Sequence, residues 1–569
     1  MSLRQSRSRT LAAVALVAAL TTVMASTGAG SQGTTPQRRP NIVIFLADDM
    51  GFADLGSYGG EIRTPNLDGL ARNGLRYTRF YNTARCWPTR AALLTGYYAQ
   101  QVSRDTVPGV ASGNAGRRPA WAPLLPAMLK TQGYRSYYAG KWHLDGEPIA
   151  EGFDRAYQSL DENSFYGPAN HNEDGRPLPA LTRDSDYYST TAYADYTITY
   201  LKEHAEKYRN QPFFAYVAFH SPHFPLQALP SDIARYTGTY DRGWDVIREE
   251  RWKKQRSLGI LKTGRLSPVE RAVGPPYDFS DSMAVVGADE VNKALPWNAL
   301  TAGQKAFQSM KMSIHAAMVD RMDQEIGRVL AQLRAMNAIE DTLVIFLSDN
   351  GASAEIMVRG DGHDPAAVPG SAKTYLSLGP GWSTVSNTPF RMHKTWLHEG
   401  GIATPLVVQW PKGIKATGQL RRNPGHVIDI VPTVLELAGA ARPEVLNRAP
   451  AASPGRSLVP TFTEDGTVPH DFLWWEHDGN RAIRVGDWKL VAALPSMRRS
   501  GEGRAGRGTA QAPPPQLGAW ELFNLAEDPS ETSNLAMKMP DKVRAMAALW
   551  TQKQQEYYAL ARLGVAAAK

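Results

Sequence analysis

The chain has 569 residues, of which 43% are hydrophobic and 21% charged, so it is long and apolar enough to fold around a substantial core. This composition excludes a disordered or a fibrous protein. A formal net charge of +8 is a small excess for this length. It does not suggest a nucleic-acid-binding protein, which would present a concentrated basic face.

The N-terminus has the layout of a secretory signal peptide. Three arginines precede an apolar run from Leu11 to Val23, and small residues follow it. Because about twenty apolar residues are needed to span a bilayer, a membrane anchor is the less favoured alternative. We therefore predict a cleaved signal peptide over residues 1–29 and a flexible leader over 30–39. The mature protein is expected in the periplasm or outside the cell, with no stable membrane span.

Short apolar runs rich in β-branched residues predict buried strands in the next part of the chain. These runs lie at 41–49, 212–219, 342–350 and 405–410. Helical patterns lie between them, for example over 307–336, where hydrophobic residues recur at helical spacing. Strands that alternate with helices predict an α/β fold with a large, mostly parallel sheet flanked by helices.

The character of the sequence changes from about Thr467. Short strand-like pieces separated by turns follow at 474–477, 482–485, 488–491 and 520–523, and a helical pattern runs over 542–562. We predict a catalytic α/β domain over 40–466 and a C-terminal α+β subdomain over 467–569, with a smaller antiparallel sheet and a helix. The Arg-, Gly- and Pro-rich stretch 497–519 predicts a mobile loop. The charged run 248–256 predicts a solvated helix face rather than a binding patch.

Oxygen-bearing side chains end two of the predicted strands. Asp48 and Asp49 end one, and Asp349 and Asn350 end the other. Each pair alone has an ordinary interpretation as a turn former or helix cap. Ligands of α/β sheets bind beyond the carboxyl ends of strands, however, and clustered carboxylates repel one another unless a cation neutralises them. Oxygen ligands without paired Cys or His favour a hard ion, Ca²⁺ or Mg²⁺, over Zn²⁺.

A single cysteine, Cys86, is unusual in an exported protein, because it can form no internal disulfide. The ordinary interpretation is a buried, inert thiol. Here the cysteine opens the sequence Cys86-Trp-Pro-Thr-Arg90, which continues to Leu-Thr-Gly96.

This C-x-P-x-R run, with the acidic strand upstream, resembles the type I sulfatases of the alkaline phosphatase superfamily. Further landmarks stand in order: Gly-Lys-Trp-His at 140–143, Pro-His-Phe-Pro at 222–225, Ser-Asp-Asn-Gly at 348–351, Lys394 before Glu-Gly-Gly-Ile at 399–402, and a closing stretch at 522–535. The resemblance runs from about Pro40 to Leu535. It is greatest to bacterial arylsulfatases, through residues 387–391 and 475–482.

The resemblance implies hydrolysis of sulfate esters at a formylglycine, which a separate maturing enzyme makes from Cys86. An aldehyde hydrates to a geminal diol, and one hydroxyl would attack sulfur to give a covalent sulfate ester. The second hydroxyl would then reform the aldehyde and expel sulfate, which a serine cannot do. Thr89 stands where many members have Ser and keeps the hydroxyl.

The family's functional residues carry over to matching positions of this chain. The implied Ca²⁺ ligands are Asp48, Asp49, Asp349, Asn350 and modified Cys86, with Mg²⁺ as the less favoured ion. The implied catalytic residues are Cys86, Arg90 to orient the diol, Lys141 and Lys394 to neutralise sulfate oxygens, His143 to promote elimination, and His223 to protonate the leaving oxygen. His220 competes with His223 for that role. Taken singly, each of these residues also has a purely structural interpretation.

Two other functions stay open. A phosphoester hydrolase of the same superfamily is the enzymatic alternative, although the acidic set lacks the His ligands of a di-zinc site. A non-catalytic binder of sulfated glycans would leave Cys86 unmodified. The expected partners are a sulfated small molecule or carbohydrate and the maturing enzyme. The candidate substrate contacts, each of which also has a structural interpretation, are His393, His398, Trp87, Tyr97, Tyr98 and Trp382.

Overall fold

The computed structural model describes residues 39–161, 163–359, 362–443, 451–494, 498–499 and 518–566, which all belong to one compact unit that begins at Arg39. The predicted signal peptide (1–29), nearly all of the predicted leader (30–39) and most of the predicted loop (497–519) therefore lie outside the described residues. Within the described ranges, no helix is both long and apolar enough to cross a membrane.

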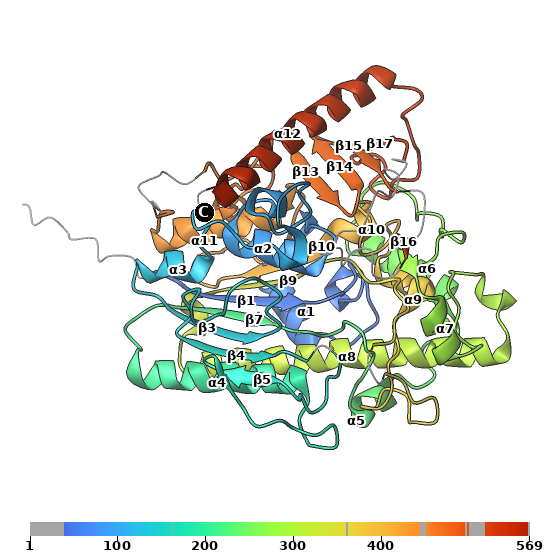
Figure 1. Ribbon diagram of the computed structural model, residues 1–569, viewed down its shortest axis with the longest axis horizontal. Helices are drawn as coiled ribbons and strands as arrows, with labels where there is room; N and C mark the ends of the chain where they lie inside the picture. Colours follow the sequence, from blue (N-terminus) through green and yellow to red (C-terminus); the bar gives the residue numbers. More distant parts are fainter. Residues whose placement is uncertain are drawn as a thin grey trace, which may run out of the picture. The chain divides into compact units, whose positions relative to one another are not determined.

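An 11-stranded mixed sheet forms the framework of the fold (Figure 1). Its strands, in spatial order, are β11 (Gln419–Arg421), β2 (Leu75–Tyr81), β10 (Ala403–Gln409), β9 (Thr342–Ser348), β1 (Asn41–Ala47), β7 (Phe213–Ala218), β3 (Arg135–Gly140), β4 (Arg155–Ser159), β5 (His171–Glu173) and β6 (Arg176–Pro177), with β12 (Gly425–His426) paired to β2. Pairing from β9 through β1, β7 and β3 to β4 is parallel, whereas β10 runs antiparallel between β2 and β9. The predicted α/β class with a mostly parallel sheet is confirmed.

Helices cover both faces of this sheet. They are α1 (Pro65–Arg72), α2 (Cys86–Thr95), α3 (Leu125–Lys130), α4 (Ser189–Lys207), α5 (Pro230–Ile233), α6 (Trp244–Ser257), α7 (Ser280–Val286), α8 (Ala302–Ala335), α9 (Gly379–Ser386), α10 (Glu399–Ile402), α11 (Ile430–Ala438) and α12 (Pro540–Ala566). Figure 1 shows α4 and α8 on one side of the sheet and α2, α3 and α11 on the other. In β1, Val43 and Phe45 pack in the core with α8, and Ile42 and Ile44 in the core with α11. Because both faces are covered, the strand is apolar from Ile42 to Ala47.

A second, four-stranded antiparallel sheet follows the main one in sequence. Its order is β13 (Leu473–His477), β14 (Asn480–Val485), β15 (Trp488–Ala492) and β17 (Glu521–Asn524). Helix α12 packs on it, with the rings of Trp474 and Trp550 stacked 5.8 Å apart. Asp478 and Gly479 have φ of 47° and 77°, the conformation of a tight hairpin turn. The predicted smaller antiparallel sheet with its helix is confirmed, and the domain boundary at 466/467 stays a prediction.

The indole of Trp475 joins this sheet to the main one. Its Nε1 donates a hydrogen bond to the carbonyl of Asn82, 2.8 Å away, in the segment between β2 and α2. The β13–β14 hairpin therefore reaches the segment that leads into α2. A further two-residue strand, β8 (Tyr277–Asp278), pairs with β16 (Arg498–Arg499).

The charged run 248–256 is only partly solvated, so the prediction of a solvated face was wrong at two positions. Lys253 is exposed, but Arg248 and Arg251 are 4% and 1% exposed. The guanidinium of Arg251 lies 2.7 Å from carboxylate oxygens of both Asp54 and Glu61. Helix α6 packs against the core on this side. The two carboxylates offset the free-energy cost of burying the guanidinium.

The buried pair of Lys311 and Glu290 gives a stability prediction. The ammonium lies 2.7 Å from both carboxylate oxygens, and both side chains are at most 1% exposed. Lys311→Met should lower the free energy of unfolding by about 3–5 kcal/mol, because Glu290 keeps a buried charge without its partner. Denaturant unfolding measures this. The control Arg334→Met, at an exposed position of the same helix, should change stability by less than about 0.5 kcal/mol. Equal effects of the two variants would contradict the prediction.

Candidate active site

The acidic residues lie together because their strands are neighbours in register. Ala47 of β1 pairs with Ser348 of β9, so Asp48 and Asp49 leave the sheet beside Asp349 and Asn350. All four side chains are buried. Asp49 has a φ of 64°, a left-handed conformation that is uncommon outside glycine and that turns the chain sharply at the strand end.

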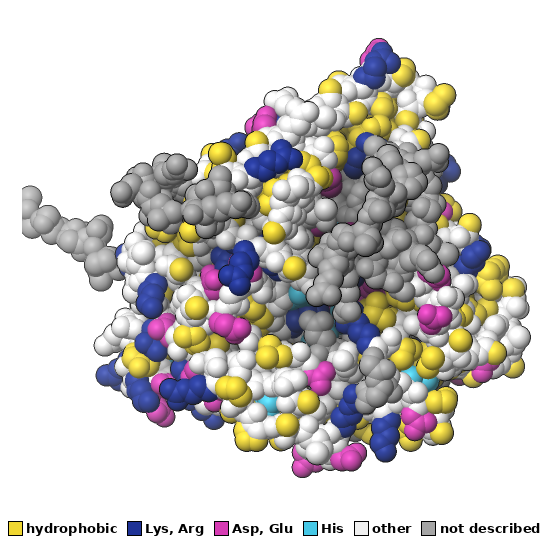
Figure 2. Space-filling model, viewed as in Figure 1, with side chains coloured by type: hydrophobic (Ala, Val, Ile, Leu, Met, Phe, Trp, Pro, Cys, Tyr) yellow, Lys and Arg dark blue, Asp and Glu magenta, His cyan; other side chains and the backbone are white. Residues whose placement is uncertain are grey.

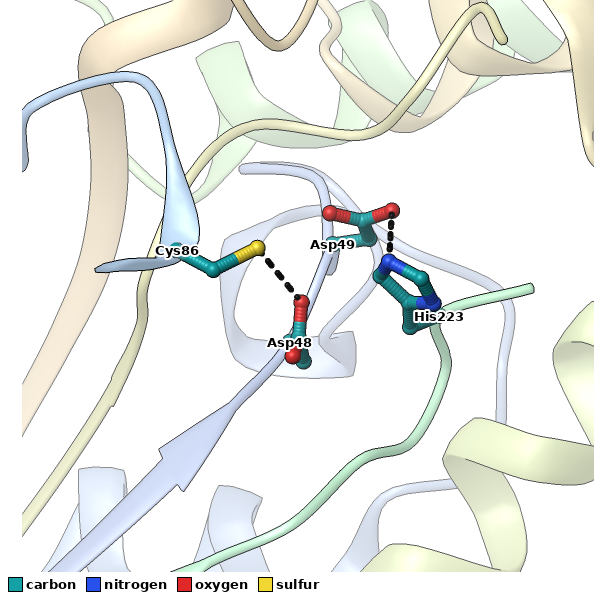
Figure 3. Close-up of side chains that lie close together, drawn as sticks. All are labelled: Asp48, Asp49, Cys86 and His223. Atoms are coloured by element: carbon teal, nitrogen blue, oxygen red, sulfur yellow. Dashed lines mark hydrogen bonds and ion pairs between the residues drawn. The ribbon is translucent and has the colours of Figure 1, made fainter. Parts of the chain in front are cut away.

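Helix α2 brings Cys86 to the same edge. Its Sγ lies 3.3 Å from Oδ1 of Asp48 (Figure 3). The same Sγ lies 3.4 Å from Oδ1 of Asn350. The helix begins at the cysteine, and Pro88 fits in its first turn, where a missing N–H costs little. Thr89 accepts a hydrogen bond from the backbone N–H of Thr83, 3.0 Å away, which holds the incoming segment against the helix.

Arg90 follows Cys86 by one helical turn and therefore points to the same side of α2. Its Nε and Nη2 donate to Oδ2 of Asp349 over 3.1 and 2.8 Å, and Nη2 also donates to Asp48 over 2.9 Å. Nη1 donates to the carbonyl of Lys141 over 2.6 Å. This fully buried guanidinium fork ties the two acidic strand ends to β3.

Two lysines that are far apart in the sequence form ion pairs with the acids. Lys141 follows β3, and its Nζ lies 2.8 Å from Oδ2 of Asp48. A side chain on the preceding residue, Gly140, would bring Cβ to 2.0 Å from the carbonyl of Ala218, so only glycine lets β3 and β7 lie this close. Lys394 lies before α10, with Nζ 2.8 Å from Asp49.

The histidines divide into those that reach the acids and those that do not. Nε2 of His223 lies 3.8 Å from Oδ2 of Asp49 (Figure 3), and Nδ1 lies 2.5 Å from the carbonyl of Phe224. The ring of His220 instead stacks on Phe165, with the ring centroids 4.9 Å apart. The geometry therefore favours His223 over His220 as the histidine near the acids.

His143 lies on another side of the cysteine. Its ring packs 5.6 Å from that of Trp87, the residue after Cys86, and its φ of 50° is again left-handed. The other nine predicted site residues form one continuous set of contacts, each of 3.8 Å or less. His143 is connected to these nine residues only by its ring contact with Trp87, the residue that follows Cys86.

Burial and mutual repulsion set the electrostatics of the site. Burial, reinforced by the charge of Asp48, raises the pKa of Asp349 to about 7. Burial opposes ionisation of Asp48 too, but the charge of Lys141 and other cations outweighs it and lowers its pKa. Burial and the charge of Asp349 raise the pKa of the Cys86 thiol, which keeps it protonated and makes the unmodified thiol a weak nucleophile.

Figure 2 shows Lys, Arg and His side chains gathered in a hollow near the middle of one face.

The donor set fits a divalent cation. One ligand atom each from Asp48, Asp49, Cys86 and His223 lies within 4.8 Å of the others. Ligands on opposite sides of Ca²⁺ at 2.3–2.6 Å would be about 5 Å apart, so these atoms can share one ion. Asn350 adds an amide oxygen that faces Cys86. A buried group of carboxylates is also what such an ion would neutralise.

Several residues near the site escaped the sequence analysis. Glu355 lies 3.2 Å from Lys394 and 3.1 Å from Arg85, and the charge of Arg85 followed by that of Lys394 overcomes burial to lower its pKa to about 2. His477 bonds Asp105 over 2.9 Å, and its ring lies 5.6 Å from Trp87. Segment 475–482 contributes to the arylsulfatase resemblance, but no pattern in it indicates these contacts.

Other candidate substrate contacts have structural partners. Nδ1 of His393 lies 2.9 Å from Ser383, and Nε2 of His398 lies 2.8 Å from Glu521. Trp382, Tyr97 and Tyr98 are buried in the core. Of the four aromatic candidates, Trp87 is therefore the one beside the cysteine.

Comparison with known proteins shows the family to which the chain belongs. The family model described as Sulfatase matches residues 40–440. An uncharacterized sulfatase of Schizosaccharomyces pombe is 30% identical over 91% of this chain and 94% of its own length. An arylsulfatase of Klebsiella aerogenes is 32% identical over 75% of this chain and 91% of its own length. The crystal structure of Ps i-CgsB in complex with k-i-k-neocarrahexaose superposes with a TM-score of 0.60 at 22% identity, over 91% of this chain and 93% of that one.

The fold and the acidic, cysteine-bearing strand edge define a type I sulfatase of the alkaline phosphatase superfamily. The chain belongs to the sulfatase family, and its activity is that of a sulfuric ester hydrolase.

Proposed function

We propose that this protein is an exported, Ca²⁺-dependent, arylsulfatase-like enzyme in which a separate maturing enzyme converts Cys86 to formylglycine. The supporting observation is that Sγ of Cys86 lies 3.3 Å from Asp48 and 3.4 Å from Asn350, among buried acids and cations. The hydrated aldehyde supplies one hydroxyl that attacks sulfur and a second that releases sulfate from the transient covalent ester. Conversion also explains a lone cysteine in an exported chain.

The cation is proposed to bind Asp48, Asp49, Asp349 and Asn350, with modified Cys86 completing the set. When bound, it supplies Lewis-acid stabilisation of negative charge. The contacts of Arg90 to Asp48 and Asp349 keep those carboxylates oriented without it. Arg90 therefore orients two of the proposed cation ligands and also offers hydrogen-bond donors next to the modified residue.

The basic side chains of the site suit a sulfate ester. Lys141 and Lys394 are compact positive donors that neutralise sulfate oxygens as charge develops during attack. Burial and these lysines lower the pKa of His223, and an anionic ester bound there raises it again. His223 is then placed to donate a proton to the leaving oxygen, and His143 to take a proton when sulfate is released.

His223 gives a prediction that separates it from its neighbour. His223→Asn should lower kcat roughly a hundredfold for an alkyl sulfate and much less for p-nitrophenyl sulfate, because p-nitrophenolate leaves without protonation. Steady-state kinetics with both esters measure this. The comparison variant His220→Asn should lower both rates by the same factor, since its ring stacks on Phe165. A larger dependence on the leaving group in the His220 variant would reverse the two roles.

The choice between sulfate and phosphate esters is tested directly. The purified protein should hydrolyse p-nitrophenyl sulfate with a higher kcat/KM than p-nitrophenyl phosphate or bis-p-nitrophenyl phosphate. The reason is that the described acidic cluster offers one cation site with a single nearby histidine, not the His-rich ligands of a di-zinc site. A large preference for phosphate would establish the phosphoester hydrolase. Sulfate binding without any hydrolysis would establish a non-catalytic binder.

A further inference from the structure

Glu355 is a buried carboxylate next to the proposed sulfate site, and the proposed mechanism gives it no role. It lies in the segment that follows β9, and its side chain is 0% exposed. Both carboxylate oxygens have cationic partners. Oε1 lies 3.1 Å from Nη1 of Arg85, and Oε2 lies 3.2 Å from Nζ of Lys394. Because a buried carboxylate is costly unless it is paired, these two cations stabilise it there.

The Glu355 carboxylate is both fixed in position and charged. The hydroxyl of Ser353 donates to its Oε2 over 2.9 Å and accepts from the backbone N–H of Glu355 over 3.2 Å. Burial opposes ionisation of Glu355, but the charges of Arg85 and Lys394 outweigh burial and lower its pKa to about 2. Glu355 therefore carries a negative charge at neutral pH.

Lys394 places this charge close to the substrate. Its ammonium lies 2.8 Å from Asp49 and is the proposed donor to the sulfate oxygens of the ester. The same ammonium nitrogen lies 3.2 Å from Oε2 of Glu355. Because a hydrogen bond from an ammonium to a charged oxygen is about 2.8 Å long, an ester oxygen held by Lys394 lies within about 6 Å of the Glu355 carboxylate.

Sulfate and phosphate monoesters have nearly the same shape but differ in charge. A sulfate monoester carries one negative charge, whereas a phosphate monoester carries two above its second pKa of about 6. At about 6 Å and an effective dielectric constant of about 20, repulsion by one further unit charge weakens binding by a factor of roughly a hundred. A fixed carboxylate at this distance therefore penalises the phosphate ester more than the sulfate ester.

We infer that Glu355 is a specificity-determining residue whose charge beside Lys394 disfavours esters with two negative charges and so selects sulfate over phosphate monoesters. The inference rests on the proposed function and assigns a residue to its expected preference for sulfate. Glu355 acts on the ester through the electrostatic field and through Lys394, so it is not a catalytic residue. A merely structural role, in which Glu355 only holds Arg85 and Lys394, would affect both classes of ester alike.

Glu355→Gln tests the charge with a side chain of nearly the same shape. Hydrolysis of p-nitrophenyl sulfate is inhibited at about pH 8 with phenyl phosphate, which then carries two charges, and with phenyl methylphosphonate, which carries one. The inhibition constant of phenyl phosphate, divided by that of phenyl methylphosphonate, should fall at least about tenfold in this variant, because Arg85 and Lys394 lose their shared negative partner. A displaced Lys394 alters both constants together and leaves the ratio unchanged. If the variant is inactive, calorimetric titration with the two inhibitors gives the same ratio.

Two control variants complete the experiment. Glu355→Asp shortens the side chain but keeps the charge, so the ratio should stay close to that of the unaltered enzyme. Glu325→Gln removes a buried carboxylate of α8 that pairs with Arg321 and Arg328, and it should also leave the ratio unchanged. An unchanged ratio in Glu355→Gln, or an equal fall in Glu325→Gln, would overturn the inference while leaving the sulfatase activity intact. Absence of sulfate ester hydrolysis by the unaltered protein would refute the proposed function and this inference with it.

Discussion

Replacing Cys86 by alanine should lower kcat for p-nitrophenyl sulfate by roughly 10⁴-fold or more, a decrease typical of the removal of a catalytic nucleophile. The physical reason is that alanine at position 86 carries no group that can be converted to an aldehyde. The thermal midpoint should stay close to that of the unaltered protein. The Cys86 side chain is small, and its described partners are hydrogen bonds to Asp48 and Asn350.

Two controls make this result specific. Cys86→Ser keeps a hydroxyl but cannot reform an aldehyde, so sustained turnover should be lost in it as well. In the unaltered protein, peptide mapping should find the peptide of residue 86 lighter by about 18 Da than its cysteine form, as oxidation to an aldehyde requires. An alanine variant with normal activity, or an active protein whose cysteine is wholly unmodified, would contradict the assignment.

Removal of divalent cations should lower the rate by roughly a thousandfold, because a bound cation contributes several kcal/mol of charge stabilisation. Treatment with EDTA followed by dialysis tests this. Added Ca²⁺ should restore activity more fully than Mg²⁺, since the ligands are oxygen atoms on several separate elements. Ca²⁺ should also raise the thermal midpoint of the metal-free protein, because it binds the folded state alone.

Matched variants assign the effect to the site. Asp48→Asn removes one negative ligand and should abolish the rise in thermal midpoint on adding Ca²⁺. Asp195→Asn makes the same chemical change at an exposed position of α4 and should leave that rise intact. Full activity after exhaustive chelation, or an equal response in the two variants, would count against a metal at this cluster.

The sheet was predictable because its signals are local. Within the run 41–49, every position from Ile42 to Ala47 is apolar and two acids follow, which indicates both a strand covered on two faces and a polar strand end. The same pattern at 342–350 predicted the second strand. That the two strands are adjacent, with Ala47 opposite Ser348, follows from the pairing of the whole sheet and not from either segment.

Charged side chains were predicted less well, because their surroundings depend on distant partners. The run 248–256 indicates a helix with many charges, but only the carboxylates of Asp54 and Glu61 explain why Arg251 is buried. Glu355 likewise has no motif of its own. Its contacts with Arg85 and Lys394 arise where three separate loops meet.

The amino-acid sequence alone determined the alternation of strands and helices, the acids at two strand ends, and the C-x-P-x-R run that opens α2. These features were predictable because hydrophobic periodicity and short motifs lie within short segments of the sequence. The tertiary structure decided which groups meet. Lys394 contacts Asp49 across 345 positions of sequence. Such pairings depend on how elements pack, and no local pattern carries that information.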